Sequence, residues 1–334
     1  MDIEHSEDKI KGTTWRSCFK NQLGVAACLA GGLFAGLVPA TSRYVQDRGY
    51  TAIQLHLFND VLILLVPLCI VAYQKTNLRL KEYKQALHLM FQGLGRFVNI
   101  LCHIYAYQFV PPANAETVHN ASAPVFCVIF SCTFLQEDPS CATIVGSLWC
   151  IAGVVLLGYG SFVNKGSSTD WDVGLGMGLA IFSAIFHGAI IVHAKGLAEN
   201  TSRTMMIVYT YVISTVCAGI ALCFTSVTWH LELFTAAMLS ISCFSTAFRV
   251  LFFYLALKLV EVNAITALYQ VNVFPAYGLQ WLMLGFVPTV LEGFGLGCVL
   301  IGTSCVAIWE AFARWKANRH RAFIKELNFT LPKN

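Results

Sequence analysis

The 334-residue sequence predicts an all-helical, multi-pass membrane protein. Two observations predict this fold class: about ten apolar stretches are each long enough to cross a bilayer, and the last five resemble the first five. Hydrophobic residues make up 57% of the chain and charged residues only 12%, whereas a soluble domain carries about 25% charged residues. Because lipid offers no hydrogen-bond partners to the backbone, each stretch should be an α-helix.

The apolar stretches follow one another with short loops between them. A span needs roughly 20 mostly apolar residues. The expected spans are 23–43, 53–73, 86–107, 113–135, 142–162, 173–193, 205–225, 235–257, 262–284 and 290–312. The polar segment 1–22 lacks the basic-then-apolar order of a cleaved signal peptide, so the first span is expected to stay in the membrane. Segments 1–22 and 313–334 are expected to be tails, without a soluble domain.

The sequence gives little support to enzymes, metal sites or nucleic-acid binding. No GxSxG, HExxH or P-loop pattern is present, and the nine histidines are scattered. The 13 cysteines form no CxxC pair, and most fall inside spans, where cysteine acts as a small packing residue. No basic stripe with interleaved aromatic residues is present. We therefore expect no catalytic residues, no metal, no cofactor and no nucleic-acid partner.

The orientation follows from the positions of lysine and arginine. With the N-terminus in the cytosol, 17 of the 22 lie on the cytosolic side and 3 on the other side, and Arg96 and Arg249 lie within spans. This bias predicts that both termini are cytosolic. The sequons at Asn200 and Asn328 would then stay unglycosylated. The membrane is either the plasma membrane or that of the endoplasmic reticulum or Golgi.

The two halves of the chain share matched residues. Pro139, Gly146 and Gly153 correspond to Pro288, Gly295 and Gly302, each at an offset of 149. A unit of five spans that occurs twice is inverted in the membrane, which is the architecture of alternating-access transporters. The alternative is chance similarity among glycine-rich apolar helices. We expect repeats at 23–162 and 173–312, joined by a non-cytosolic linker at 163–172.

Longer segments resemble a known family. YAYQFVPPANAETVHNASAPVFCVIFSCTFLQEDPS and LALKLVEVNAITALYQVNVFPAYGLQWLMLGFVPTVLEGFGLGCVLIG resemble the ends of EamA repeats. The chain is therefore identified as similar to the drug/metabolite transporter superfamily, and most similar to the G subgroup of solute carrier family 35. It departs from the family pattern after the fourth span, where Gln136, Glu137 and Asp138 replace the usual Lys-Glu or Glu-Arg pair. The resemblance implies a carrier of small organic solutes without naming the solute.

Three of the charged residues within the expected spans are candidates for a functional role. Arg96 and Arg249 occupy the third and eighth spans, and Glu116 lies early in the fourth. A charge at membrane depth is costly, so it usually has a partner or faces water. The arginines are candidates for binding an anionic solute, since a guanidinium can donate two parallel hydrogen bonds to a carboxylate or phosphate. The alternatives are a structural bridge between Arg96 and Glu116, or snorkelling.

A polar stripe recurs on the fourth and ninth spans, at positions that share one helical face. Its members are Glu116, His119 and Asn120, then Thr266, Tyr269 and Gln270 at an offset of 150. The stripes are expected to line a shared substrate cavity; the alternative is hydrogen bonding between packed helices. We also hypothesise that Glu116 or His119 carries a proton during transport.

These features predict a secondary transporter that moves a small anionic solute, carboxylate or nucleotide-sugar-like, by alternating access. The alternative is a non-transporting scaffold or regulator of another membrane protein. The expected partners are the solute and membrane lipid, and the pattern also allows a homodimer.

Overall fold

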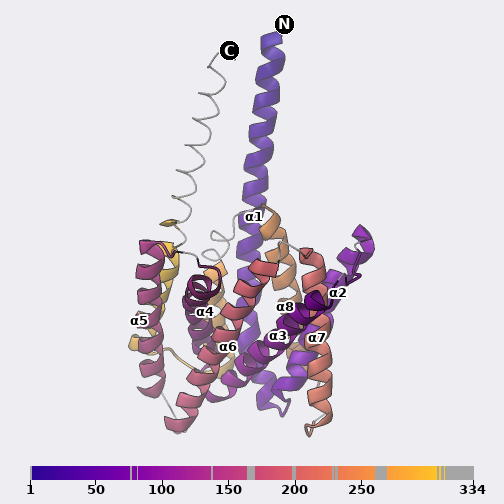
Figure 1. Cartoon of the computed structure of the whole chain (residues 1–334). Helices are drawn as coiled ribbons and strands as arrows, with labels where there is room; N and C mark the ends of the chain where they lie inside the picture. The colour runs from indigo at the N-terminus through magenta and orange to yellow at the C-terminus, as the bar shows by residue number, and fades with distance from the viewer. Residues whose placement is uncertain are drawn as a thin grey trace.

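The computed structural model describes residues 2–75, 77–80, 82–136, 138–163, 170–197, 201–227, 229, 232–259, 269–306, 308–309 and 312. Its regular structure in these ranges is helical (Figure 1). The helices are α1 (Asp2–Asp47), α2 (Ala52–Gln74), α3 (Tyr83–Phe109), α4 (Pro112–Phe134), α5 (Cys141–Val163), α6 (Asp170–Leu197), α7 (Arg203–Cys223), α8 (Leu233–Leu259), η1 (Gln270–Asn272) and α10 (Val273–Leu284). A further apolar helix spans Val290–Val306.

The helices match the apolar stretches of the sequence, and most ends lie within a few residues of the expected ones. The first helix is the main exception, because α1 begins at Asp2 instead of near residue 23. Its polar first half extends beyond the helical bundle as a continuous rod (Figure 1). The part of α1 that is apolar enough to lie in a membrane is Gln22–Asp47.

Seven of the described helical segments are long and apolar enough to cross a membrane, fewer than the ten expected. They come from α1, α2 and α4–α8. Helix α3 is continuous over 27 residues, but polar side chains, including Arg96, occur among its apolar residues. Helix α10 has only 12 residues, and the helix Val290–Val306 is among the shorter apolar helices. The structure therefore supports a multi-pass membrane protein and seven of its spans by length and composition.

The expected ninth span differs locally from a regular α-helix. Residues 260–268 lie outside the described part, and Gln270–Asn272 form a 3-10 turn before α10. Pro275 has no backbone N–H to donate to the carbonyl of Val271, so a regular α-helical bond is missing at this point. Of the polar stripe predicted here, Gln270 lies in this 3-10 turn, whereas its counterpart Asn120 lies in the α-helix α4.

Local signals in the sequence explain several helix starts. Thr51 and Gln54 form a reciprocal capping box at the start of α2. Thr289 and Glu292 do the same at the start of Val290–Val306: the Thr289 backbone N–H donates to Glu292 Oε2 at 2.6 Å, and the Glu292 N–H donates to Thr289 Oγ1 at 3.2 Å. Ser140 caps α5, so both helices begin just after a proline and a hydroxyl residue.

The two capping residues occupy equivalent positions in the two halves. Ser140 and Thr289 are separated by the same offset of 149 as the matched prolines before them. Ser140 Oγ accepts a hydrogen bond from the Thr143 backbone N–H at 3.1 Å, as Thr289 Oγ1 does from Glu292. Each hydroxyl thus satisfies a backbone donor that the first turn of a helix leaves without a partner.

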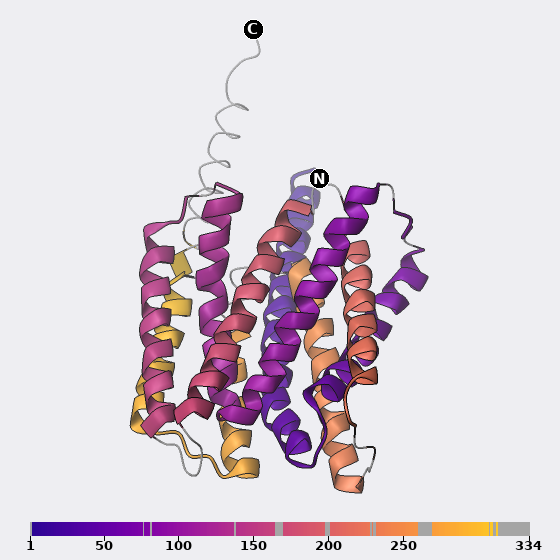
Figure 2. The same ribbon diagram turned by 60° about the horizontal axis from the view of Figure 1, so that its bottom comes forward.

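Helices from the two halves of the chain pack closely together. Helix α1 lies along α8, and α3 lies along α6, while α2 packs against α7 (Figures 1 and 2). Two cavities lie between helices of this bundle. Helix α4 packs against both α5 and α6, and α1 also contacts η1 and α10.

Helix α5 and the helix Val290–Val306 meet at four glycines. A Cβ atom at Gly153 would lie 2.7 Å from the carbonyl oxygen of Gly295, and a Cβ atom at Gly146 would lie 2.7 Å from that of Gly302. Only glycine leaves room for this approach, so the backbones are in direct contact. Figure 2 shows the two helices side by side at one edge of the bundle.

Candidate functional site

A small cavity of about 40 Å³ lies between α1, α2, α3, α4 and α8. Four charged residues line it: Arg96 from α3, Arg249 from α8, Glu116 from α4 and Asp60 from α2. The structure thus brings together the three intramembrane charges predicted as candidates and adds a fourth, Asp60. Charged groups gathered around one buried cavity are the usual sign of a solute or ion site in a membrane protein.

Arg96 forms an ion pair with Asp60. Arg96 Nη2 lies 2.9 Å from Asp60 Oδ1, and the Asp60 side chain is 1% exposed. The Ser214 hydroxyl donates to Asp60 Oδ2 at 2.5 Å, and His56 Nε2 lies 3.4 Å from the same oxygen. The Arg96 guanidinium also stacks on the Tyr211 ring, 4.0 Å from its centre. The bridge that the sequence suggested between Arg96 and Glu116 is therefore replaced by a bridge to Asp60.

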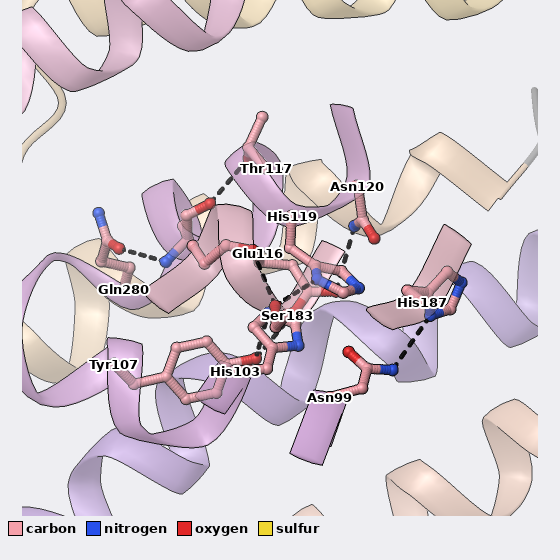
Figure 3. Close-up of polar contacts among 12 residues, drawn as sticks. Asn99, His103, Tyr107, Glu116, Thr117, His119, Asn120, Ser183, His187 and Gln280 are labelled. Carbon is pink, nitrogen blue, oxygen red and sulfur yellow. Dashed lines mark hydrogen bonds and ion pairs between the residues drawn. The ribbon is translucent and has the colours of Figure 1, made fainter. Parts of the chain in front are cut away.

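Glu116 is buried and accepts hydrogen bonds from its own half of the chain (Figure 3). The Tyr107 hydroxyl donates to Oε2 at 2.8 Å, and His103 Nε2 lies 3.3 Å from that oxygen. Asn120 Nδ2 donates to Oε1 at 3.2 Å, which is the contact expected one helical turn further along α4. Both carboxylate oxygens of Glu116 therefore have partners.

Arg249 differs from Arg96 in its partners. It is partly buried and lines the cavity from α8. Within the part of the chain that the structure describes, no hydrogen bond or ion pair of its guanidinium is found. Both carboxylates of the cavity are engaged by the groups named above, whereas the Arg249 guanidinium has no such contact among the described residues.

Three histidine rings contact one another behind Glu116: His103 and His119 are stacked, and His187 lies edge-on to His119. The ring centres of His103 and His119 are 4.1 Å apart, and those of His119 and His187 are 5.1 Å apart. His119 Nδ1 lies 2.7 Å from the Ser183 hydroxyl, and Asn99 Nδ2 lies 3.3 Å from His187 Nδ1. Figure 3 shows that this cluster joins α3, α4 and α6. His119, which was predicted to line the cavity, therefore lies behind the cavity and is connected to it through His103.

The second polar stripe contributes less to the cavity. Thr266 lies outside the described residues. The Tyr269 ring packs edge-on against Phe253, with the ring centres 6.1 Å apart, and Gln270 is 8% exposed in η1. Neither is among the residues that line the small cavity.

A larger cavity of about 850 Å³ opens at one end of the bundle. Its lining comes from the beginning of α3 and the ends of α4 and α6, and includes Gln85, His88, Phe130 and His193. His88 Nδ1 lies 2.9 Å from His193 Nε2, and Gln92 Nε2 lies 2.7 Å from His193 Nδ1. This cavity has the size of a small-molecule site, which typically ranges from about 300 to 1,000 Å³.

At the other end of the bundle, hydrogen bonds join α1 to α3 and α8. Arg43 Nη1 donates to the carbonyl of Tyr107 at 2.6 Å, and Gln46 Nε2 donates to the carbonyl of Ile104 at 2.9 Å. The hydroxyls of Ser42 and Ser242 are 3.0 Å apart, which joins α1 to α8. Tyr107 and Ile104 lie at the end of α3 opposite to the larger cavity.

The binding residues predicted from the sequence did not include Asp60, His103 or Tyr107, although Asp60 and His103 were weaker candidates. An acidic residue inside an apolar span is a usable signal, and Asp60 carried it. Its pairing with Arg96 on α3, 36 positions away, depends on the packing of the helices. Within the described ranges, no group of three or more histidine, cysteine or acidic side chains has an arrangement that could hold a metal ion.

The fold and the charged cavity define a multi-pass membrane protein with a buried polar site. Residues 22–159 match the EamA-like transporter family. Solute carrier family 35 member G1 of Mus musculus is 33% identical over 138 residues, which are 40% of this chain and 37% of that protein. The Homo sapiens protein of the same name is 27% identical over 202 residues, covering 57% and 55% of the two chains.

These similarities confirm the predicted resemblance to the drug/metabolite transporter superfamily and to the G subgroup of solute carrier family 35. Both are groups of transporters and not of enzymes. The matched part of the chain spans about a third to a half of the length of these curated relatives. A protein of known crystal structure shares the fold, with a TM-score of 0.59 at 16% identity over 87% of this chain and 96% of that one.

Proposed function

We propose that the protein is a secondary transporter that moves a small anionic organic solute, a carboxylate or a nucleotide-sugar-like molecule, by alternating access. The observation that carries this proposal is Arg249, a cation that lines the central cavity without an ion pair or hydrogen bond to any described residue. Asp60 and Glu116 both accept hydrogen bonds already. The cavity therefore offers donors to a solute, and a guanidinium favours carboxylate or phosphate oxygens.

Alternating access is supported by the difference between the two ends of the bundle. One end contains the cavity of about 850 Å³, while the other is joined by the contacts of Arg43, Gln46 and Ser42. A carrier that is open on one side and closed on the other has this asymmetry. With both termini in the cytosol, as the lysine and arginine bias predicts, the open end faces the cytosol.

An inverted repeat is supported by reciprocal helix contacts. A two-fold axis that exchanges the two halves pairs α1 with α6, α2 with α7 and α3 with α8. The observed contacts follow this exchange, since α1 packs on α8 as α6 does on α3, and α2 packs on α8 as α7 does on α3. The glycine contacts obey the same rule, because the pair Gly146–Gly302 becomes Gly295–Gly153 at the offset of 149.

The proposal is tested by uptake into liposomes that contain the purified protein. Labelled dicarboxylates, tricarboxylates and nucleotide sugars are screened first. Arg249→Ala should then abolish uptake of the transported anion, and Arg249→Lys should restore it only partly, because an ammonium lacks the two-pronged donor geometry. Arg79→Ala, in the exposed loop between α2 and α3, is the matched control and should keep wild-type uptake.

A non-transporting scaffold or regulator is the other candidate function. A protein of this kind would show no uptake of any anion, and its role would not depend on Arg249. Unchanged uptake kinetics in Arg249→Ala would contradict the assignment of Arg249 to the solute.

A further inference from the structure

We propose that each anion crosses the membrane together with one proton, which binds at the Glu116–His103 pair. This inference rests on the proposed anion transport and adds its coupling ion. The inference is based on the balance of charges around the central cavity and on the cluster of histidines next to that cavity.

The charged residues of the cavity are balanced before a solute arrives. Asp60 neutralises Arg96 at 2.9 Å, which leaves Arg249 and Glu116 as the remaining charges of opposite sign among the lining residues. The cavity has a volume of only about 40 Å³, so it holds little water to screen a further charge. An anion that binds Arg249 would leave the Glu116 carboxylate without a compensating cation in a low-dielectric site, which is unfavourable.

A proton on the Glu116–His103 pair removes that imbalance. His103 Nε2 and Glu116 Oε2 are 3.3 Å apart, and both side chains are buried. A proton can bind to the carboxylate, or to the imidazole as a cation that faces it. The proton comes from water on one side of the membrane and is released to water on the other side with the anion. This O–H or N–H bond forms as an O–H bond of hydronium in the water breaks, and the reverse happens when the proton is released.

The groups that face the pair limit it to one proton. His119 stacks on His103 at 4.1 Å, and His187 lies against His119 at 5.1 Å, so two charged imidazoles would repel each other at short range. Arg249 on α8 and Arg96 on α3 also oppose a positive charge here, although Asp60 on α2 offsets Arg96. Tyr107 on α3 donates to Glu116 and stabilises the carboxylate.

Binding of the anion and of the proton should therefore be cooperative. An anion at Arg249 cancels the positive charge that opposes a proton at Glu116 and His103. By thermodynamic reciprocity, the proton then increases the affinity for the anion by the same factor. Proton and solute would move in the same direction.

The coupling is measured in liposomes that contain the protein and a trapped pH-sensitive dye. The probe is whichever of radiolabelled succinate, tricarballylate or UDP-glucose, one from each solute class, is taken up. The wild type should acidify the lumen as the anion enters, and an inward proton gradient should accelerate uptake. Glu116→Gln should still move the anion, but without acidification and without stimulation by the gradient.

His103→Asn provides a second variant if Glu116→Gln does not fold, and it should lower the ratio of protons to anions. Glu232→Gln, at an exposed glutamate that lines neither cavity and pairs with Arg48, is the control and should keep the wild-type ratio. Anion uptake without a change in lumen pH, or with equal coupling in wild type, Glu116→Gln and His103→Asn, would overturn the inference alone. Absence of uptake for all anions would overturn the proposed function and this inference with it.

Discussion

Arg96 and Arg249 line the same cavity, but their surroundings give them different roles. Arg96 is fixed by Asp60 and by the ring of Tyr211, whereas Arg249 has neither kind of contact within the described chain. We therefore assign Arg96 to the link between α2, α3 and α7, and Arg249 to the solute. From the sequence alone, Arg96 was preferred over Arg249 as the residue that binds the solute. The sequence could not show the partners of either arginine, because these partners depend on helix packing.

The stability of the protein should depend on Arg96 more than on Arg249. Arg96→Ala leaves the Asp60 carboxylate buried without its cation, which should cost about 3–5 kcal/mol of folding free energy. The measurement is the thermal unfolding midpoint of the detergent-solubilised protein. Arg249→Ala should keep a midpoint close to that of the wild type.

The double variant Asp60→Ala/Arg96→Ala provides the control for this prediction. Because it removes both charges, it should be more stable than Arg96→Ala. With the single variant Asp60→Ala added, the three variants complete a double-mutant cycle that gives the coupling energy of the pair. A midpoint of Arg96→Ala equal to that of the wild type would show that the ion pair contributes nothing to stability.

Among the helices, close contact depends on small residues at fixed positions. The glycines of α5 and of Val290–Val306 were visible in the sequence as matched positions, and the structure shows that they face each other across one interface. Their pairing follows from the antiparallel course of the two helices. Spacing within one helix could not reveal which glycine of the other helix it would meet.

Gly153→Val should destabilise the contact between these helices. Its Cβ atom would lie 2.6 Å from Val299 Cγ2 and 2.7 Å from the Gly295 carbonyl, so the helices would have to separate. A cost of about 1–3 kcal/mol is typical of overpacking. Gly158→Val on the same helix has no atom within 4 Å of the new Cβ atom and is the matched control. Equal unfolding midpoints for the two variants would contradict a tight interface.

For the molecule as a whole, the proposed alternating access requires the contacts of Arg43, Gln46 and Ser42 to open. Ser42 and Ser242 have hydroxyls 3.0 Å apart, which is close enough for a disulfide after substitution by cysteine. Ser42→Cys/Ser242→Cys under oxidising conditions should block uptake, and a reducing agent should restore it. Either single variant under the same oxidant controls for the native cysteines. Full uptake by the cross-linked protein would contradict an opening at this end.

The orientation of the whole chain is tested by glycosylation in microsomes. With both termini cytosolic, the sequons at Asn200 and Asn328 should remain unmodified. A sequon within a spacer peptide inserted into the exposed 285–289 segment, on the predicted non-cytosolic side, should be glycosylated by the lumenal oligosaccharyltransferase. Glycosylation at Asn200 would reverse the proposed orientation.

The sequence by itself determined the membrane class, the helix positions and the resemblance to transporters, because apolar length and composition are properties of each segment alone. It also singled out Arg96, Arg249 and Glu116, since charges are rare in lipid. Only the tertiary structure decided that Asp60 is the partner of Arg96, that His103 and Tyr107 contact Glu116, and that hydrogen bonds join α1 to α3 and α8 at one end of the bundle. These contacts join different helices, and the packing that brings distant residues within 3–4 Å of each other is not encoded in the spacing along any one helix.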